Sequence, residues 1–142
     1  MTEPAAKPDA TTRYDIGMRT RRAVLGDDHV NRAEANKSPF DEDFQRFITE
    51  GAWGTVWSRP QWTHRQRSCV TLALLAALGH YDEVALHVRA TANTGATVDD
   101  MREAMLHVAV YAGVPCANHA NKIIKQTLAA MAVEQAAEQP KG

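Results

Sequence analysis

The sequence has few cysteines, no long apolar run and no excess of charge of one sign. Its two cysteines, Cys69 and Cys116, form no Cys-x-x-Cys pair and no Cys/His cluster of zinc-binding spacing, so we expect neither a disulfide framework nor a metal site. Lys and Arg number 16 against 17 Asp and Glu, for a net charge of -1. This balance argues against a broad surface for nucleic acid or membrane. We expect small molecules or other protein chains as ligands.

No segment is suited to cross a membrane or to direct secretion. The longest apolar run covers residues 69–79, with Thr71 as an interruption, and is too short to span a bilayer. The first 15 residues lack the apolar core of a signal peptide. We therefore predict a cytoplasmic protein, and its 142 residues, 44% of them hydrophobic, suffice for a single domain.

Strand-type alternation of apolar and polar residues is also missing, and the apolar residues recur at helical spacing. We predict an all-α bundle of five to six helices over residues 13–133. A mobile tail at residues 1–12 and a frayed tail at residues 134–142 flank it. The expected helices lie at about residues 14–25, 40–48, 63–79, 82–95, 97–112 and 115–131.

Aromatic residues are few and unevenly placed. The three phenylalanines, Phe40, Phe44 and Phe47, recur at i, i+4 and i+7, a stripe typical of a core or a subunit interface. The three tryptophans lie within residues 51–62 with two glycines and a proline, which predicts a loop with about one helical turn. This loop either plugs the end of the bundle or walls a pocket, and Trp57 is the better candidate for a wall.

One predicted helix, which Thr97 is suited to cap and Gly113 to end, carries most of the chemical information. Within it, Glu103, His107 and Tyr111 follow one another at intervals of four, so they share one face. Apolar residues occupy most other positions, so we expect burial on most sides, with the polar stripe paired internally or facing a cavity. The alternative is an exposed helical pair without a chemical role.

Three further polar residues are candidates for a site. His87 lies on an apolar helix face, where a histidine is usually a satisfied core group but can belong to a site. Arg65 lies in the first turn of its helix, where the helix dipole disfavours a cation; an anion could hold it there, or it could simply be exposed. Arg89 lies on a different face from His87 and could reach a rim or a neighbouring subunit.

Several pieces of the sequence carry a resemblance. They are Leu-Ala-Ala-Leu-Gly at residues 75–79, His87 followed by Asn-Thr-Gly at residues 93–95, and the stripe that ends at Tyr111 and leads into Ala-Gly-Val-Pro-Cys-Ala-Asn. With these pieces the chain resembles the carboxymuconolactone decarboxylase family over about residues 14–131.

The resemblance implies an all-α fold of the alkylhydroperoxidase D type and a homo-oligomer, a hexamer or a trimer, without metal or cofactor. It implies a carboxy-lyase that converts 4-carboxymuconolactone to β-ketoadipate enol-lactone and carbon dioxide in protocatechuate breakdown. The redox branch of the same superfamily uses a Cys-x-x-Cys pair. Here His119 stands three residues after Cys116, so dithiol chemistry lacks its second thiol.

The implied reaction suits the polar residues. The electron pair of the departing carboxylate passes through the adjacent double bond to the lactone carbonyl, so the substrate carries its own electron sink and no cofactor is required. The protein must add a proton and a donor for the oxyanion. We expect His107, oriented by Glu103, to deliver the proton. His87 would donate to the oxyanion or exchange roles with His107, and Tyr111 is a second possible donor.

Substrate binding would need cations and a dry pocket. Arg65 and Arg89 are the candidates for the substrate carboxylates, because guanidinium pairs with carboxylate bidentately, and Trp57 is a candidate wall that excludes water. Two other functions stay open. One is a thiol-dependent peroxidase or disulfide reductase that uses Cys116, and the other is a non-catalytic oligomer that binds a small acid.

Overall fold

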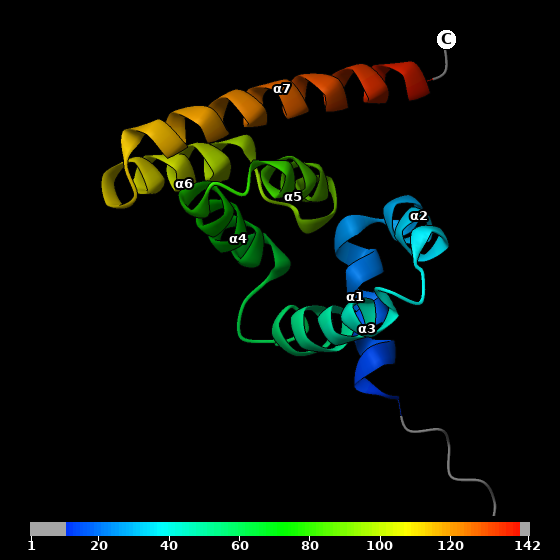
Figure 1. Cartoon of the computed structure of the whole chain (residues 1–142). Helices are drawn as coiled ribbons and strands as arrows, with labels where there is room; N and C mark the ends of the chain where they lie inside the picture. The colour runs from blue at the N-terminus through cyan, green and yellow to red at the C-terminus, as the bar shows by residue number, and fades with distance from the viewer. Residues whose placement is uncertain (1–10, 140–142) are drawn as a thin grey trace, which may run out of the picture. The chain divides into compact units, whose positions relative to one another are not determined.

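The structure is a computed structural model that describes residues 11–139 (Figure 1). Every regular element in this range is helical, which confirms the all-α prediction. The described chain holds seven α-helices and one π-helix, more than the predicted five to six. The two additional helices are α2 (Asp27–Asn36), which lies between the first two predicted helices, and the π-helix, which lies in the predicted loop. Helix α3 (Glu42–Ile48) corresponds to the helix predicted at residues 40–48.

The described residues form two compact units. One comprises residues 11–22 and 27–60, and the other comprises residues 23–26 and 61–139. The single domain predicted over residues 13–133 stays a prediction. Of the predicted N-terminal tail, residues 1–10 lie outside the described part of the chain, whereas the backbone N–H of Thr12 donates to the Asp15 carboxylate at 3.2 Å.

The first unit is built on a close approach of two helices. Its elements are α1 (Arg13–Leu25), whose last turn belongs to the second unit, with α2, α3 and the π-helix η1 (Thr49–Val56). A Cβ atom on Gly17 would lie 2.0 Å from the carbonyl oxygen of Thr49, and one on Gly54 would lie 2.6 Å from the carbonyl oxygen of Arg13. Only glycine allows the two backbones to meet at this distance.

The predicted loop over residues 51–62 begins as a π-helix, which extends to Val56, and continues as turns and irregular backbone at residues 57–62. Hydroxyl groups satisfy backbone carbonyls along it: Thr49 Oγ1 donates to Gln45 O at 2.7 Å, and Ser58 Oγ donates to Trp53 O at 2.6 Å. Gly54 of this π-helix serves the close contact with α1, whereas a Cβ atom on Gly51 would meet no heavy atom within 4 Å. Trp57 is buried, with its ring 5.2 Å from that of Trp53.

The basic residues of α1 are not all solvated. Arg21 is buried, and its guanidinium lies 3.4 Å from both Glu34 Oε1 and Gln45 Oε1. Its partners come from α2 and α3, 13 and 24 positions further along the chain, so the sequence pattern alone does not reveal them.

The second unit contains the long C-terminal helix. Its elements are α4 (His64–Leu78), α5 (Tyr81–Thr94), α6 (Val98–Tyr111) and α7 (Val114–Glu138). Helix α7 runs along α5 and α6, and α4 packs against the same two helices (Figure 1). The core consists of Leu72, Ala76, Val84, Val88, Met101, Met105, Val108, Ala117, Ala120 and Ile124.

The helix ends of this unit follow the sequence signals. Thr63 and Thr97 form capping boxes with Gln66 and Asp100, and Gly79 ends α4 with a φ of 74°. Helix α7 continues to Glu138, beyond the end predicted at about residue 131. The frayed tail at residues 134–142 stays a prediction, and residues 140–142 lie outside the described range. Among residues 11–139, no helix combines the length and apolar character that crossing a membrane requires.

Candidate functional site

The predicted polar stripe lines one pocket on α6. Glu103, His107 and Tyr111 surround it together with Leu106 and Val110, and its volume is about 300 Å³. The His107 and Tyr111 rings are nearly parallel, with 11° between their planes and 6.2 Å between their centroids. The structure therefore brings together the three residues that the sequence placed on one face.

The pocket is shallow and open in the single chain, so the expected burial of α6 on most sides is wrong. Its buried residues, Met101, Met105 and Val108, form one face. On the other side Val110 and Tyr111 are 77% and 85% exposed. The reason is that α4 and α7 are the helices packed closely on α6, and together they cover only that one face.

The three polar groups are free to meet a ligand. Within the described range, no hydrogen bond joins Glu103 to His107, and neither side chain takes part in a salt bridge. An imidazole flanked one turn away by a carboxylate and a phenol can move a proton and stabilise an oxyanion. This arrangement suits acid–base chemistry on a small molecule.

His87 is not part of this pocket. It is buried on α5 beside Val84 and Val88, the same face that contributes to the core. The structure thus places the second predicted histidine in the interior of the unit, apart from the lining of the α6 pocket.

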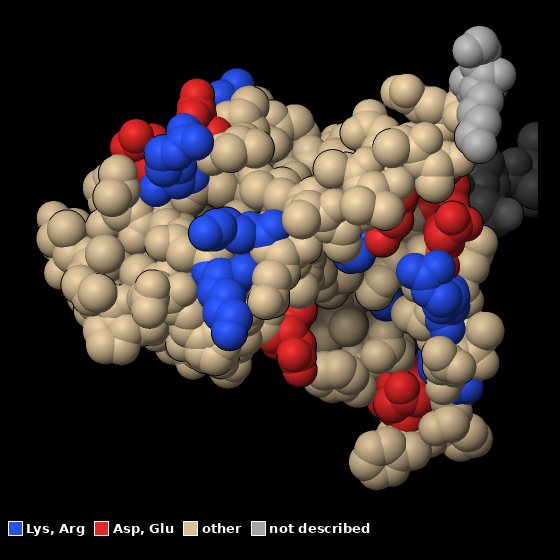
Figure 2. Space-filling view, turned by 90° about the horizontal axis from the view of Figure 1, so that it is seen from above, with Lys and Arg blue, Asp and Glu red and all other residues tan. Residues whose placement is uncertain are grey.

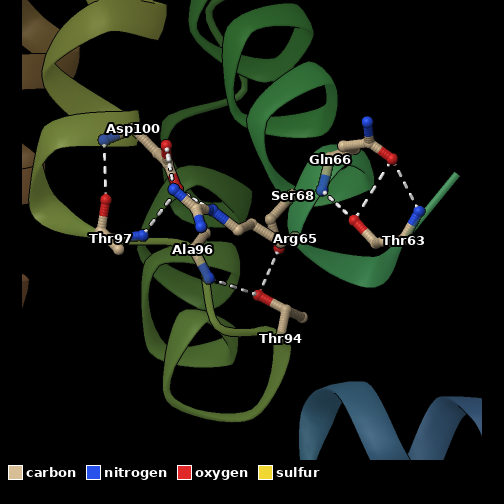
Figure 3. A network of polar contacts seen from close by, with 8 residues as sticks. All are labelled: Thr63, Arg65, Gln66, Ser68, Thr94, Ala96, Thr97 and Asp100. Carbon is tan, nitrogen blue, oxygen red and sulfur yellow. Dashed lines mark hydrogen bonds and ion pairs between the residues drawn. The ribbon is translucent and has the colours of Figure 1, made fainter.

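The anion that pairs with Arg65 is a carboxylate of the chain itself, that of Asp100. Its Nε and Nη2 atoms donate to the two carboxylate oxygens of Asp100 at 2.7 and 3.0 Å, which joins the start of α4 to the start of α6 (Figure 3). The Arg65 guanidinium and then the backbone N–H of Thr97 lower the pKa of Asp100 from 3.8 to about 2. The sequence did not identify Asp100 as the partner. A cation placed against the helix dipole, as Arg65 is, was the signal that an anion lies nearby.

A second set of hydroxyls fixes the same corner of the unit. Ser68 Oγ and Thr94 Oγ1 lie 2.7 Å apart and are buried, and Thr94 Oγ1 accepts a hydrogen bond from the backbone N–H of Ala96 (Figure 3). These contacts hold the connection between α5 and α6 against α4. The start of the helix that bears the pocket is therefore well anchored.

The Arg65–Asp100 pair predicts a pH dependence. Because the pKa of Asp100 is lower in the folded state, this carboxylate stabilises the fold above about pH 4, and the contribution is lost as the pH falls toward 2. Arg65→Gln removes the largest cause of the shift. We expect the difference in urea midpoint between wild type and Arg65→Gln to be larger at about pH 6 than at about pH 3. A difference that does not change with pH would contradict this assignment.

Arg89 and Trp57 also have partners away from the α6 pocket. Arg89 forms a bidentate pair with Glu134, at 2.8 and 3.1 Å, which joins α5 to α7 and lowers the pKa of Glu134. Trp57 belongs to the first unit, where it packs on Trp53. Neither residue lines the pocket that Glu103 and His107 share.

The cysteines give no dithiol centre. Both are free and half-buried, and the Cys116 thiol donates to the Gly113 carbonyl at 3.2 Å. Burial raises the pKa of Cys69, which disfavours its thiolate. In the part of the chain that the structure describes, no group of three or more His, Cys, Asp or Glu side chains is placed to hold a metal ion.

Known proteins resemble this chain over most of its length. The model of the carboxymuconolactone decarboxylase family matches residues 42–126. A 4-carboxymuconolactone decarboxylase of Acinetobacter baylyi is 49% identical over 108 residues, which are 76% of this chain and 81% of that protein. Nitrosuccinic acid decarboxylase npaB of Metarhizium robertsii is 42% identical over 115 residues, 81% of this chain and 80% of that protein. A 4-carboxymuconolactone decarboxylase of Pseudomonas putida is 50% identical over 46 residues, 32% of this chain and 96% of that sequence.

Proposed function

Because the chain belongs to the carboxymuconolactone decarboxylase family, we propose that it converts 4-carboxymuconolactone to β-ketoadipate enol-lactone and carbon dioxide. The observation that carries the proposal is the 49% identity to the Acinetobacter baylyi 4-carboxymuconolactone decarboxylase, over 81% of that protein. The α6 pocket supports it by offering the acid–base groups that the reaction uses.

The chemistry requires one proton and one oxyanion donor. The bond that breaks joins the departing carboxylate to its ring carbon, and the electron pair passes through the ring double bond to the lactone carbonyl oxygen. Carbon dioxide leaves, and a dienolate remains. A proton added to the ring carbon next to the carbonyl then gives the enol-lactone. In this proposal the imidazolium of His107 donates that proton.

The neighbours of His107 take the supporting roles. Glu103, one turn earlier, orients the imidazole and interacts with its charged form. Tyr111, one turn later, donates from its hydroxyl to the developing oxyanion. Tyr111 is preferred to His87 for this role because it lines the same pocket as His107, and a role for His87 stays a prediction.

Arg65 and Arg89 remain the proposed partners of the substrate carboxylates. Each already binds a carboxylate of this chain through two hydrogen bonds, the geometry by which guanidinium recognises carboxylate. A substrate carboxylate would replace Asp100 or Glu134. A role for Trp57 as a wall against water stays a prediction.

We also propose that the enzyme works as a homo-oligomer, a trimer or a hexamer. Loss of carbon dioxide is favoured when the carboxylate gives up its water. The α6 pocket of the single chain is open, with Tyr111 at its edge exposed. A second copy of the chain would supply the missing cover.

Nitrosuccinic acid is a second candidate substrate, favoured by the 42% identity to nitrosuccinic acid decarboxylase npaB. Its nitro group can accept the electron pair in place of the lactone carbonyl, and His107 would again protonate carbon. Purified protein should be supplied with each acid while carbon dioxide release is followed. We expect kcat/KM to be at least about tenfold higher for the lactone. The reverse order would favour the second candidate, and no release from either acid would contradict both.

A further inference from the structure

Helix α3 has an aromatic face and no buried residue. Phe44 and Phe47 lie on this helix and Phe40 in the turn before it, and they are 59%, 71% and 96% exposed. Phe44 and Phe47, three positions apart on α3, lie on one side of this helix. An exposed aromatic face of this kind is typical of a surface that contacts another protein.

Asp43 lies beside the aromatic face, whereas Glu42 lies on the other side of α3, where it lines a pocket with Lys37. Glu42 and Asp43 occupy the first turn of α3 and are exposed. Neither takes part in a salt bridge with another of residues 11–139. Residues 40–47 are called the acidic aromatic segment below.

The second unit has a groove with the opposite charge. It lies between α6 and α7, has a volume of about 650 Å³, and is floored by apolar side chains, of which Met101 and Ile124 are core residues. Lys122 and Lys125 stand at its rim, and neither is salt-bridged to a described residue. The basic groove is lined by Val98, Met101, Arg102, Asn118, Asn121, Lys122, Ile124, Lys125, Gln126 and Leu128.

We propose that the acidic aromatic segment of one copy docks in the basic groove of a second copy of this chain. The two surfaces match in kind, because Phe44 and Phe47 meet the apolar side chains of the groove while Asp43, beside them on α3, meets Lys122 and Lys125. A second copy of the chain is the proposed ligand of the basic groove, because the chain itself carries both surfaces of the contact. On the face shown in Figure 2, charged side chains of both signs stand in small groups among uncharged surface.

This contact would be heterologous, because two different surfaces meet. Repeating such a contact closes a ring when the rotation between copies allows it. The groove includes the first turn of α6, the helix that carries Glu103 and His107. Docking would therefore fix the start of the proposed catalytic helix in each copy.

Charge reversal tests the contact. Two double variants, Glu42→Lys with Asp43→Lys and Lys122→Glu with Lys125→Glu, each place like charges across the interface. We expect wild type to sediment as an oligomer and each variant alone as a smaller species with unchanged helical circular dichroism. An equimolar mixture of the two variants should recover the oligomer, because each segment then finds a groove of opposite charge on the other variant.

A matched control separates this effect from a change in net charge. Asp82→Lys with Glu83→Lys makes the same change in the exposed first turn of α5, outside both surfaces, and should sediment like wild type. A monomeric wild type, or oligomers of wild-type mass from both double variants, would overturn the proposal. So would a mixture that stays dissociated, which is the result expected if the segment docks within its own chain.

Discussion

Replacing His107 with alanine is expected to lower kcat/KM for 4-carboxymuconolactone by about 100- to 10,000-fold, the usual contribution of a positioned general acid. The residue lines the α6 pocket between a carboxylate and a phenol, and its exposed side chain is not needed for the core. The loss should therefore come without a change in melting temperature. Steady-state rates of carbon dioxide release, with calorimetry on the same samples, measure both quantities.

The control for this variant is another exposed histidine of the same unit. His80 precedes α5 and makes no capping hydrogen bond with its side chain, so His80→Ala should retain the wild-type kcat/KM. If His107→Ala stays within about threefold of wild type, general acid catalysis by this residue is excluded, since even a modest contribution of that kind exceeds this factor. The proton donor would then have to be sought elsewhere, with His87 as the next residue to replace.

Gly17→Ala is expected to destabilise the first unit by about 3 kcal/mol, and by more if the helices separate. The added Cβ would lie 2.0 Å from the carbonyl oxygen of Thr49 and 2.9 Å from the backbone nitrogen of Gly54. Both are backbone atoms, so relief requires α1 and η1 to move apart. Urea unfolding followed by tryptophan fluorescence reports on this unit, because Trp53 and Trp57 are buried in it.

Gly51 provides the matched control. It lies in the same π-helix, but a Cβ atom there would meet no heavy atom within 4 Å. Gly51→Ala should therefore be neutral or stabilise by up to about 1 kcal/mol, as alanine does in helices. Equal urea midpoints for the two alanine variants would show that the close approach of α1 and η1 does not determine stability.

Local features of the fold were predictable because they depend on residues within about four positions of one another. The capping boxes of Thr63 and Thr97, the glycine at the end of α4 and the shared face of Glu103, His107 and Tyr111 all have this property. For the same reason the sequence located the polar stripe without a knowledge of tertiary contacts.

Features that depend on distant residues were not predictable. Arg65 and Asp100 are 35 positions apart, and the partners of Arg21 come from two other helices. The burial of α6 depends on which helices cover it, so the apolar composition of this helix did not reveal that Val110 is exposed. The prediction of a loop failed over residues 51–56 of the tryptophan-rich segment for another reason. Glycine there indicated a turn, but glycine also allows two helices to approach closely.

The most direct test of the proposed mechanism follows the proton that is added to the dienolate. Wild-type protein should convert 4-carboxymuconolactone in D₂O, and the enol-lactone should be analysed immediately after turnover by NMR with a chiral shift reagent, which separates the signals of the two mirror-image monodeuterated products. If a side chain on α6 protonates the dienolate, the product will carry one deuterium on the ring carbon next to the carbonyl, on a single face. Equal labelling of both faces, or release of carbon dioxide no faster than in a protein-free control, would contradict the account.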